Sequence, residues 1–298
     1  MKKTLFQGAC TALVTPFLDG KVNYPMLEQL LRRQMEAGIR AIVLCGTTGE
    51  APTLSDAEKL EIFRRGKAFV KDRCLILAGT GSNCTAHAVD LSAAAQDAGA
   101  DGLLVVSPYY NKATAEGLCA HYSAIANAVD IPVILYNVPS RTGVDMPVSV
   151  YRRLSALPNI AGVKEASGDI TKITKTIAAC GPGFGVWSGN DEHTVAAMAL
   201  GASGVISVTS NVVPVLVQAM AMAALDGDAD TATSLQLRLQ KLNELMFCQV
   251  NPIPVKAAMR SIGYDCGDCR LPLTPLDPCY EKQLPAVLTD CGNSKFML

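Results

Sequence analysis

Eight short apolar runs, each followed by a segment with helical patterning, restrict the fold of this chain more than any other feature. The runs are rich in β-branched residues and recur at the spacing of strand–helix units; they cover residues 9–14, 41–45, 75–78, 102–106, 133–136, 161–164, 185–188 and 204–207. Parallel strands need a crossover long enough to hold a helix, so this alternation predicts a parallel sheet. Because eight such units close on themselves, the sequence predicts an α/β fold of the (β/α)8 TIM-barrel type.

Helix boundary signals agree with this alternation. Ser55 and Glu58 have the spacing of a capping box, which predicts a helix that runs to Val70. An open doubly wound sheet is the alternative fold, but it usually has fewer strands and a glycine-rich fingerprint after the first of them. Here the first strand runs instead into Thr-Pro-Phe at residues 15–17.

The pattern changes after residue 210. Four later segments have helical patterns with no strand pattern between them: residues 212–225, 229–247, 254–262 and 279–288. No Pro-rich or Ser-rich linker separates them from the barrel. We therefore expect a barrel core over residues 1–210 whose eighth helix continues to about residue 226, and a C-terminal helical extension over residues 227–298 packed on the barrel.

Composition narrows the functional class. The chain has 298 residues, of which 49% are hydrophobic and 18% charged, and a net charge of −1. This balance excludes disorder for most of the chain and argues against a nucleic-acid or membrane-surface partner. The N-terminus lacks the apolar run of a signal peptide, and no stretch reaches the ~18 apolar residues of a membrane span. The eleven cysteines are then expected to be reduced thiols in a cytoplasmic protein.

No metal or organic cofactor is expected. Two of the three histidines, His87 and His121, fall in predicted helices, and His193 follows the seventh strand without a carboxylate or thiol pattern. The C-terminal cysteines include one C-x-x-C pair but lack the second pair that zinc needs; they are Cys266, Cys269, Cys279 and Cys291. Metal-assisted hydrolysis therefore has little support.

Active sites of this barrel type lie at the C-terminal ends of the strands, and Lys164 is the most informative residue there. It ends the sixth predicted strand and should point into or just above the barrel mouth. A neutral lysine amine can attack a ketone and form a Schiff base. An ion pair with Glu165 or another carboxylate is the equally weighted alternative. Lys256 is the rival nucleophile, but it lies on a predicted helix beyond the barrel.

Hydroxyl and cationic groups at neighbouring strand ends suit the same chemistry. Tyr136 ends the fifth strand and can relay protons, with Thr47 connecting it to a further hydroxyl such as Tyr110. The backbone amides of Thr47 and Thr48 can hold a carboxylate as an anion nest. Arg141 is placed for a bidentate contact with a carboxylate, and a surface ion pair is its alternative role.

Four motifs carry a resemblance that covers most of the chain. They are GTTGE at 46–50, YNVPSRTG at 136–143, GVKEASGD at 162–169 and NPIPVKAAM at 251–259. Together they resemble the dihydrodipicolinate synthase family, now called 4-hydroxy-tetrahydrodipicolinate synthase, from about Phe6 to Leu276. The wider superfamily includes N-acetylneuraminate lyase and other pyruvate-dependent aldolases. The motifs of this chain resemble those of the synthase branch of that superfamily, in the two threonines of GTTGE and in the Ser-Arg-Thr-Gly run at 140–143.

The resemblance implies a role for each strand-end residue. Lys164 would form the Schiff base with pyruvate, and Thr47 and Thr48 would hold the pyruvate carboxylate. Tyr136, Thr47 and Tyr110 would form the proton relay, with Tyr110 reaching in from a neighbouring subunit. These roles agree with the chemistry inferred from the residues alone.

The resemblance also implies a second substrate and an assembly. Arg141 would bind the carboxylate of L-aspartate-4-semialdehyde, and Gly189 and the carbonyl of Ile206 would line the pocket. The product would be (4S)-4-hydroxy-2,3,4,5-tetrahydrodipicolinate, an early step towards diaminopimelate and lysine. Family members are commonly homotetramers built as dimers of dimers.

Two other functions stay open. The nearer one is a sister aldolase that cleaves N-acetylneuraminate or another 2-keto-3-deoxy acid, and Arg141 in its motif argues against it. The more distant one is a catalytically silent barrel that acts as a binding protein. The intact set of strand-end residues argues against that alternative.

Regulation by lysine is expected to be weak or absent. Many family members are inhibited by lysine between paired subunits, and the resemblance places the corresponding positions at Ala51, Pro52, Asp56, Lys59, Asn83, His87 and Tyr109. Only Asn83 and Tyr109 match the regulated pattern. His87 stands where a glutamate would pair with the ammonium group of the effector, and Lys59 adds a positive charge. Asp56 in place of the lost carboxylate is the alternative.

Overall fold

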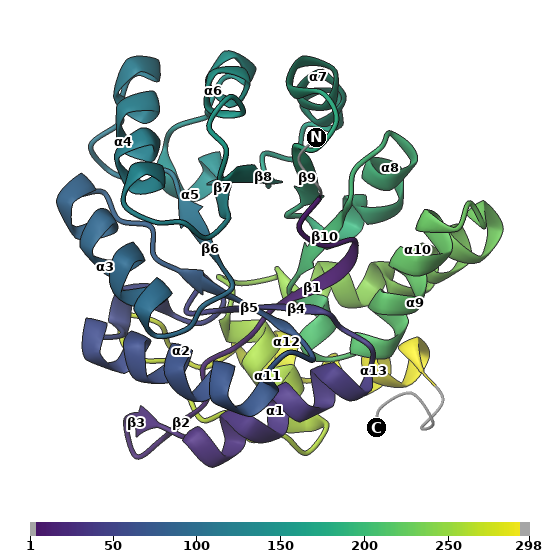
Figure 1. The fold of residues 1–298 in the computed structure, drawn as a ribbon. Coiled ribbons are helices and arrows are strands. Elements are labelled where there is room, and N and C mark those ends of the chain that lie inside the picture. The colour runs from purple at the N-terminus through teal and green to yellow at the C-terminus, as the bar shows by residue number, and fades with distance from the viewer. Residues whose placement is uncertain (1–3, 293–298) are drawn as a thin grey trace.

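Eight parallel strands close into a barrel in the computed structural model, which describes residues 4–292 (Figure 1). Each barrel strand pairs with the next barrel strand along the chain, and the last pairs with the first. The strands are β1 (Gly8–Ala12), β4 (Ala41–Leu44), β5 (Leu75–Gly79), β6 (Gly102–Val106), β7 (Val133–Asn137), β8 (Ile160–Glu165), β9 (Gly185–Ser188) and β10 (Gly204–Ser207). The predicted TIM-barrel fold is confirmed, with a short hairpin of β2 (Phe17–Leu18) and β3 (Lys21–Val22) added after β1.

Helices surround this barrel (Figure 1). They are α1 (Tyr24–Glu36), α2 (Asp56–Val70), α3 (Thr85–Asp97), α4 (Ala115–Asn127), α5 (Pro139–Thr142), α6 (Val148–Leu154), α7 (Ile170–Cys180), α8 (Thr194–Ala199) and α9 (Pro214–Leu225). The predicted capping box is confirmed at the start of α2, where the Ser55 hydroxyl accepts from the Glu58 amide and Glu58 accepts from the Ser55 amide. No helix in the described part of the chain is long and apolar enough to cross a membrane.

The barrel interior is filled by side chains from the strands. Trp187 is fully buried there and stacks on Phe6, with ring centroids 4.6 Å apart. Gly185 makes room for it, because a Cβ at that position would lie 2.3 Å from the indole ring. Tyr136 and Ile206 belong to the same interior cluster. The interior of the barrel is therefore a packed core.

Helices alone follow α9 in the described part of the chain. They are α10 (Ala229–Met246), α11 (Ile253–Ser261), α12 (Pro278–Glu281) and α13 (Leu284–Cys291). The single helix expected over residues 279–288 is wrong, because the helix breaks at Lys282 and Gln283. Pro285 has no N–H to donate to the Glu281 carbonyl, so the chain starts a new helix instead of continuing the old one.

The extension packs on the barrel helices and on itself. Helix α10 contacts α9 and α13, and α11 contacts α13. The division of the chain into a barrel core over residues 1–210 and an extension over 227–298 stays a prediction. Residues 1–3 and 293–298 of those ranges lie outside the described part.

Candidate active site

Strands β7 and β8 place Tyr136 and Lys164 side by side at the barrel mouth. The two residues are partners in the strand register, and Lys164 Nζ lies 4.5 Å from the centre of the Tyr136 ring. Only 4% of Lys164 and 7% of Tyr136 is exposed. Within residues 4–292 the Lys164 ammonium has no carboxylate within ion-pair distance. Successive strand residues face opposite sides, so Glu165 points away from Lys164, and its ion pair is with Lys172.

A cavity of about 590 Å³ opens beside this pair. Its walls include Thr47, Tyr109, Tyr136 and Arg141. Lys164 does not line the cavity itself, but it lies against Tyr136, which does line it. The cavity therefore combines a phenol, a threonine hydroxyl and a guanidinium with a buried lysine directly behind them.

The two threonines of the GTTGE motif face different surroundings. Thr47 is half-buried on the cavity wall, whereas Thr48 is buried and its hydroxyl accepts a hydrogen bond of 3.0 Å from Asn251 Nδ2. The turn that carries them is closed by two backbone bonds, Glu50 N to Thr47 O and Ala51 N to Gly46 O. The side chain of Thr47 is therefore available to a ligand, while that of Thr48 is occupied.

Arg141 reaches the cavity from the short helix α5. Its side chain is exposed, and its Nη2 donates to the Asn251 carbonyl at 3.1 Å. Among the described residues Arg141 does not form the surface ion pair that was its alternative role. Asn251 thus bridges Thr48 and Arg141. The sequence interpretation missed this residue, although it begins the NPIPVKAAM motif.

The structure does not bring Tyr110 to the cavity of its own chain. Tyr110 is 88% exposed and has a φ of 73°, while Tyr109 lines the cavity in its place. A positive φ is uncommon for a tyrosine, so the surrounding loop holds it outwards at some energetic cost. Tyr110 and Tyr136 therefore do not meet within a single chain.

Gly189 and Ile206 lie close to the lysine in different ways. A Cβ at Gly189 would lie 3.0 Å from Lys164 Cε and 2.5 Å from Ala166 Cβ, so the lysine side chain needs a glycine at that position. Ile206 is fully buried in the interior cluster, paired with Cys10 across β1 and β10. Burial raises the pKa of the nearby Asp191 carboxyl, which accepts bonds from the amides of Val208 and Thr209.

Lys256, the rival nucleophile, is tied into an ion pair. Its Nζ lies 2.6 Å from Glu50 Oε1, with the two side chains 3% and 1% exposed. The Asp268 carbonyl accepts a second bond from the same ammonium at 3.2 Å. Glu50 uses its other oxygen to accept from the Arg270 amide at 2.8 Å. With this set of partners, Lys256 makes a buried structural contact.

The histidines and cysteines lie in surroundings that differ from those of a metal site. Burial lowers the pKa of His121 to about 4, and Thr85 Oγ1 bonds its Nδ1. His87 Nε2 lies 2.8 Å from Asp56 Oδ2 at the outer part of the cavity. Burial raises the pKa of the thiols of Cys266 and Cys269 to about 12. Among residues 4–292 no group of His, Cys, Asp or Glu side chains is arranged to hold a metal ion.

Comparison with known proteins gives a consistent family. Residues 5–291 match the dihydrodipicolinate synthetase family. The 4-hydroxy-tetrahydrodipicolinate synthase of Thermoanaerobacter sp. (strain X514) is 45% identical over 292 residues, which are 98% of each chain. The solved dihydrodipicolinate synthase of Acinetobacter baumannii, complexed with pyruvate, is 44% identical with a TM-score of 0.94 and covers 96% of this chain and 99% of that one. The DHDPS of Cyanidioschyzon merolae with lysine bound is 40% identical with a TM-score of 0.94, over 97% and 99% of the two chains.

Proposed function

Because the chain belongs to the dihydrodipicolinate synthetase family, we propose that it condenses pyruvate with L-aspartate-4-semialdehyde. The product is (4S)-4-hydroxy-2,3,4,5-tetrahydrodipicolinate, which leads to diaminopimelate and lysine. The observation that carries this proposal is the buried Lys164, which has no carboxylate within ion-pair distance among residues 4–292 and packs on Tyr136 beside a cavity lined by Arg141.

The reaction begins on the Lys164 amine. Nζ adds to the ketone carbon of pyruvate, and water leaves to give an imine. Loss of a methyl proton turns the imine into an enamine, whose carbon attacks the aldehyde of the second substrate. The amino group of that substrate then attacks the imine carbon, closes the ring and releases Lys164. Tyr136 moves protons in these steps; its position on the cavity wall, with its ring against Lys164, supports this role.

Two sites in the cavity can receive the two carboxylates. Thr47, which lines the cavity, and the backbone amides of Thr47 and Thr48 hold the pyruvate carboxylate, since successive amides in a tight turn can form an anion nest. Arg141 holds the carboxylate of the semialdehyde at the cavity wall. In this proposal Gly189 and the Ile206 carbonyl also line the pocket, and Gly189 leaves room for the Lys164 side chain by its lack of a Cβ.

The relay is completed in an assembly, for which we propose a homotetramer built as a dimer of dimers. Tyr110 supports this proposal, since it is 88% exposed on its own chain, with a phenol directed away from the cavity. In the assembly this phenol enters the cavity of a neighbouring subunit and joins Thr47 and Tyr136. We place the protein in the cytoplasm, in keeping with its eleven free cysteines.

Lysine inhibits this enzyme weakly or not at all. The relevant wall of the cavity holds Asp56, Lys59 and His87. Asp56 already accepts from His87 Nε2 at 2.8 Å and Lys59 Nζ at 3.3 Å, and the His87 hydrogen bond holds its pKa below its ordinary value. A carboxylate with two cationic or donor partners has little left to offer a further ammonium group.

Two assays test the proposal. The purified protein is incubated with pyruvate and L-aspartate-4-semialdehyde, and the cyclic product is identified by mass spectrometry. Turnover of N-acetylneuraminate without this product would favour the sister aldolase. Adding millimolar L-lysine should leave the rate nearly unchanged, and strong inhibition that is lost on changing Asn83 or Tyr109 would contradict the regulatory part.

A further inference from the structure

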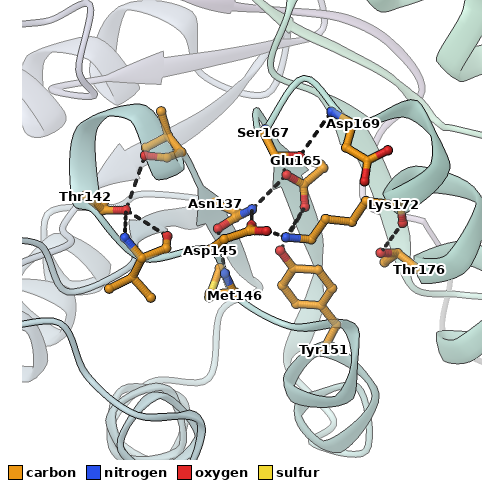
Figure 2. Close-up of polar contacts among 12 residues, drawn as sticks. Asn137, Thr142, Asp145, Met146, Tyr151, Glu165, Ser167, Asp169, Lys172 and Thr176 are labelled. Carbon is orange, nitrogen blue, oxygen red and sulfur yellow. Dashed lines mark hydrogen bonds and ion pairs between the residues drawn. The ribbon is translucent and has the colours of Figure 1, made fainter.

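A buried polar cluster lies on the outer face of β7 and β8, and Figure 2 shows its side chains around Asn137 and Glu165. Asn137 and Glu165 each follow one member of the proposed catalytic pair in the sequence and are register partners of one another. Because side chains alternate along a strand, Tyr136 and Lys164 face the barrel interior while these two face the helices. Asn137 is fully buried and Glu165 is 2% exposed.

Donors meet both oxygens of the Glu165 carboxylate. Oε1 accepts from Asn137 Nδ2 at 2.8 Å and from the Ser167 amide at 2.9 Å. Oε2 accepts from the Tyr151 hydroxyl at 2.8 Å and lies 3.7 Å from Lys172 Nζ. The carboxylate therefore ties the end of β8 to β7, to α6 and to α7 at once.

Asn137 also forms hydrogen bonds with the segment that follows β7. Its Nδ2 also donates to Asp145 Oδ1 at 2.8 Å, and its Oδ1 accepts from the Met146 amide at 3.0 Å. These bonds fix the far end of the segment that carries Arg141. The near end is fixed by Thr142, whose hydroxyl donates to the Val138 or Val144 carbonyl at 3.2 or 3.0 Å.

The charges of the cluster are arranged around Lys172. Its ammonium pairs with Asp145, approaches Glu165, and lies 5.6 Å from the centre of the Tyr151 ring. Burial and the neighbouring Glu165 raise the pKa of Tyr151, so that its hydroxyl stays a neutral donor. Burial alone would raise the pKa of Asp145, but hydrogen bonds from Lys172 and Asn137 lower it. The Lys172 ammonium thus lies close to both the Asp145 and the Glu165 carboxylates. Every polar side-chain atom of Asn137 and Glu165 has a hydrogen-bond partner.

We propose that Asn137 and Glu165 are positioning residues for the reaction. By locking the ends of β7 and β8 together, they hold Tyr136 and Lys164 at a fixed separation on the opposite face. Asn137 in addition holds the Arg141 segment, so it couples the position of the second substrate to that of the lysine. The inference rests on the proposed function, since it assigns these contacts to the imine chemistry at Lys164.

The mechanism is geometric. Beyond the strand pairing, backbone hydrogen bonds also join the residues that follow these strands to their neighbours, from Ala166 N to Asn137 O at 2.9 Å and from Gly189 N to Glu165 O at 2.7 Å. Strand ends are the places where a barrel gives way to loops, so the side-chain bonds supply the remaining restraint. A displacement of the reacting groups by about 1 Å is enough to cost on the order of 100-fold in rate.

The test compares Asn137→Ala and Glu165→Gln with the parent protein. For each protein kcat, the KM of each substrate, and the rate of borohydride-trapped imine formation with pyruvate are measured well below the melting temperature. Glu165→Gln should lower kcat and imine formation by on the order of 10- to 100-fold while leaving the KM of the semialdehyde within about twofold. Asn137→Ala should lower kcat and also raise that KM by roughly 10-fold, because it releases the Arg141 segment.

Thr176→Val is the matched control. Thr176 is buried in α7, and its hydroxyl donates to the Lys172 carbonyl at 2.7 Å in the same helix. Loss of this hydrogen bond should change the melting temperature without changing kcat or the KM of either substrate. If Asn137→Ala or Glu165→Gln does not fold, Tyr151→Phe replaces it, since this variant removes a single bond to Glu165 and should lower kcat several-fold.

The possible results distinguish a failure of the positioning role from a failure of the proposed function. Folded variants with kcat and both KM values within about twofold of the parent, and a lowered melting temperature only, would show that the cluster is structural and overturn the inference. A parent protein that forms no trapped imine at Lys164 would overturn the proposed function, and the inference with it. Trapping in the parent and the expected split between the two variants would support both.

Discussion

The barrel mouth and the junction of the barrel with the C-terminal segment each bury a lysine, and the two lysines differ in their partners. Lys164 is 4% exposed and Lys256 is 3% exposed. Lys256 lies 2.6 Å from Glu50, whereas Lys164 faces the Tyr136 ring and, within residues 4–292, has no carboxylate within ion-pair distance. Equal burial therefore serves two purposes: the paired lysine joins segments, and the unpaired one is free to react.

The junction is a set of satisfied contacts built on one loop. Glu50 accepts from Lys256 and from the Arg270 amide, and the Arg270 guanidinium makes a bidentate contact with Glu58 at 2.6 and 2.9 Å. Arg270 and Lys256 also lie over the Phe17 ring, at 4.4 and 4.3 Å from its centre. The loop held in this way is the one that presents Thr47 to the cavity, so the junction supports the site without taking part in it.

The largest expected effect is on the unpaired lysine. Lys164→Ala should lower turnover by at least ~1,000-fold, or about 4 kcal/mol, because the nucleophile is removed. Its melting temperature should stay close to that of the parent, since Lys164 forms no ion pair with any residue from 4 to 292. Assays of turnover and of thermal unfolding on the same sample decide this, and a variant that keeps a tenth of the parent activity would contradict the comparison.

Lys256→Met should act on stability instead. It leaves Glu50 buried without its cation, which costs about 3–5 kcal/mol of unfolding free energy. Urea denaturation measures this loss. The double variant Glu50→Gln with Lys256→Met is the control and should recover part of the stability, because it removes the stranded charge. A loss below about 0.5 kcal/mol in the single variant would show that the pair is not a structural contact.

Arg141→Ala tests the cavity wall at which the second substrate is proposed to bind. The variant loses a charge-assisted contact worth about 1.5–3 kcal/mol, so the KM of the semialdehyde should rise by roughly 10- to 100-fold. The KM of pyruvate should change much less. Equal effects on the two substrates, measured by varying each in turn, would make Arg141 a structural residue.

The smallest effect is a pH dependence of the junction. The Arg270 hydrogen bonds lower the pKa of Glu58 from 4.5 to about 2. A carboxyl with a lowered folded-state pKa adds stability above its unfolded value, and this stability is lost as the pH falls from about 4.5 towards 2. Because Glu58 is partly exposed, the contribution is on the order of 1–2 kcal/mol.

Urea denaturation across that pH range, in the parent and in Glu58→Gln, measures the contribution. The variant should be less stable than the parent at pH 6 and nearly equal to it at pH 2. Parallel pH profiles in the two proteins would mean that the Arg270 contact adds nothing.

The barrel could be predicted from the sequence because its signal is local. Alternation of apolar runs and amphipathic segments reports which faces are buried, and strand order follows from the short connections. The break at Lys282 and Gln283 has a weaker signal in the sequence, because the helical pattern continues across it. It depends on one missing N–H group at Pro285.

The site could be predicted in part. A lysine at a strand end is visible in the sequence, and so is the alternation that turns Glu165 away from it. The partners of Glu165 could not be predicted, because Tyr151 and Lys172 come from two separate helices and meet it only in the folded barrel. Asn251 was missed for the same reason, as its contacts with Thr48 and Arg141 join segments more than 100 residues apart.

Trapping with borohydride tests the difference between the two lysines most directly. The protein is incubated with pyruvate and borohydride, digested, and mapped by mass spectrometry, so that a reduced imine appears as a stable mass increase on one peptide. The account predicts the label on the peptide that contains Lys164, and none on the peptide that contains Lys256. Label on Lys256, or no label on either peptide, would contradict it.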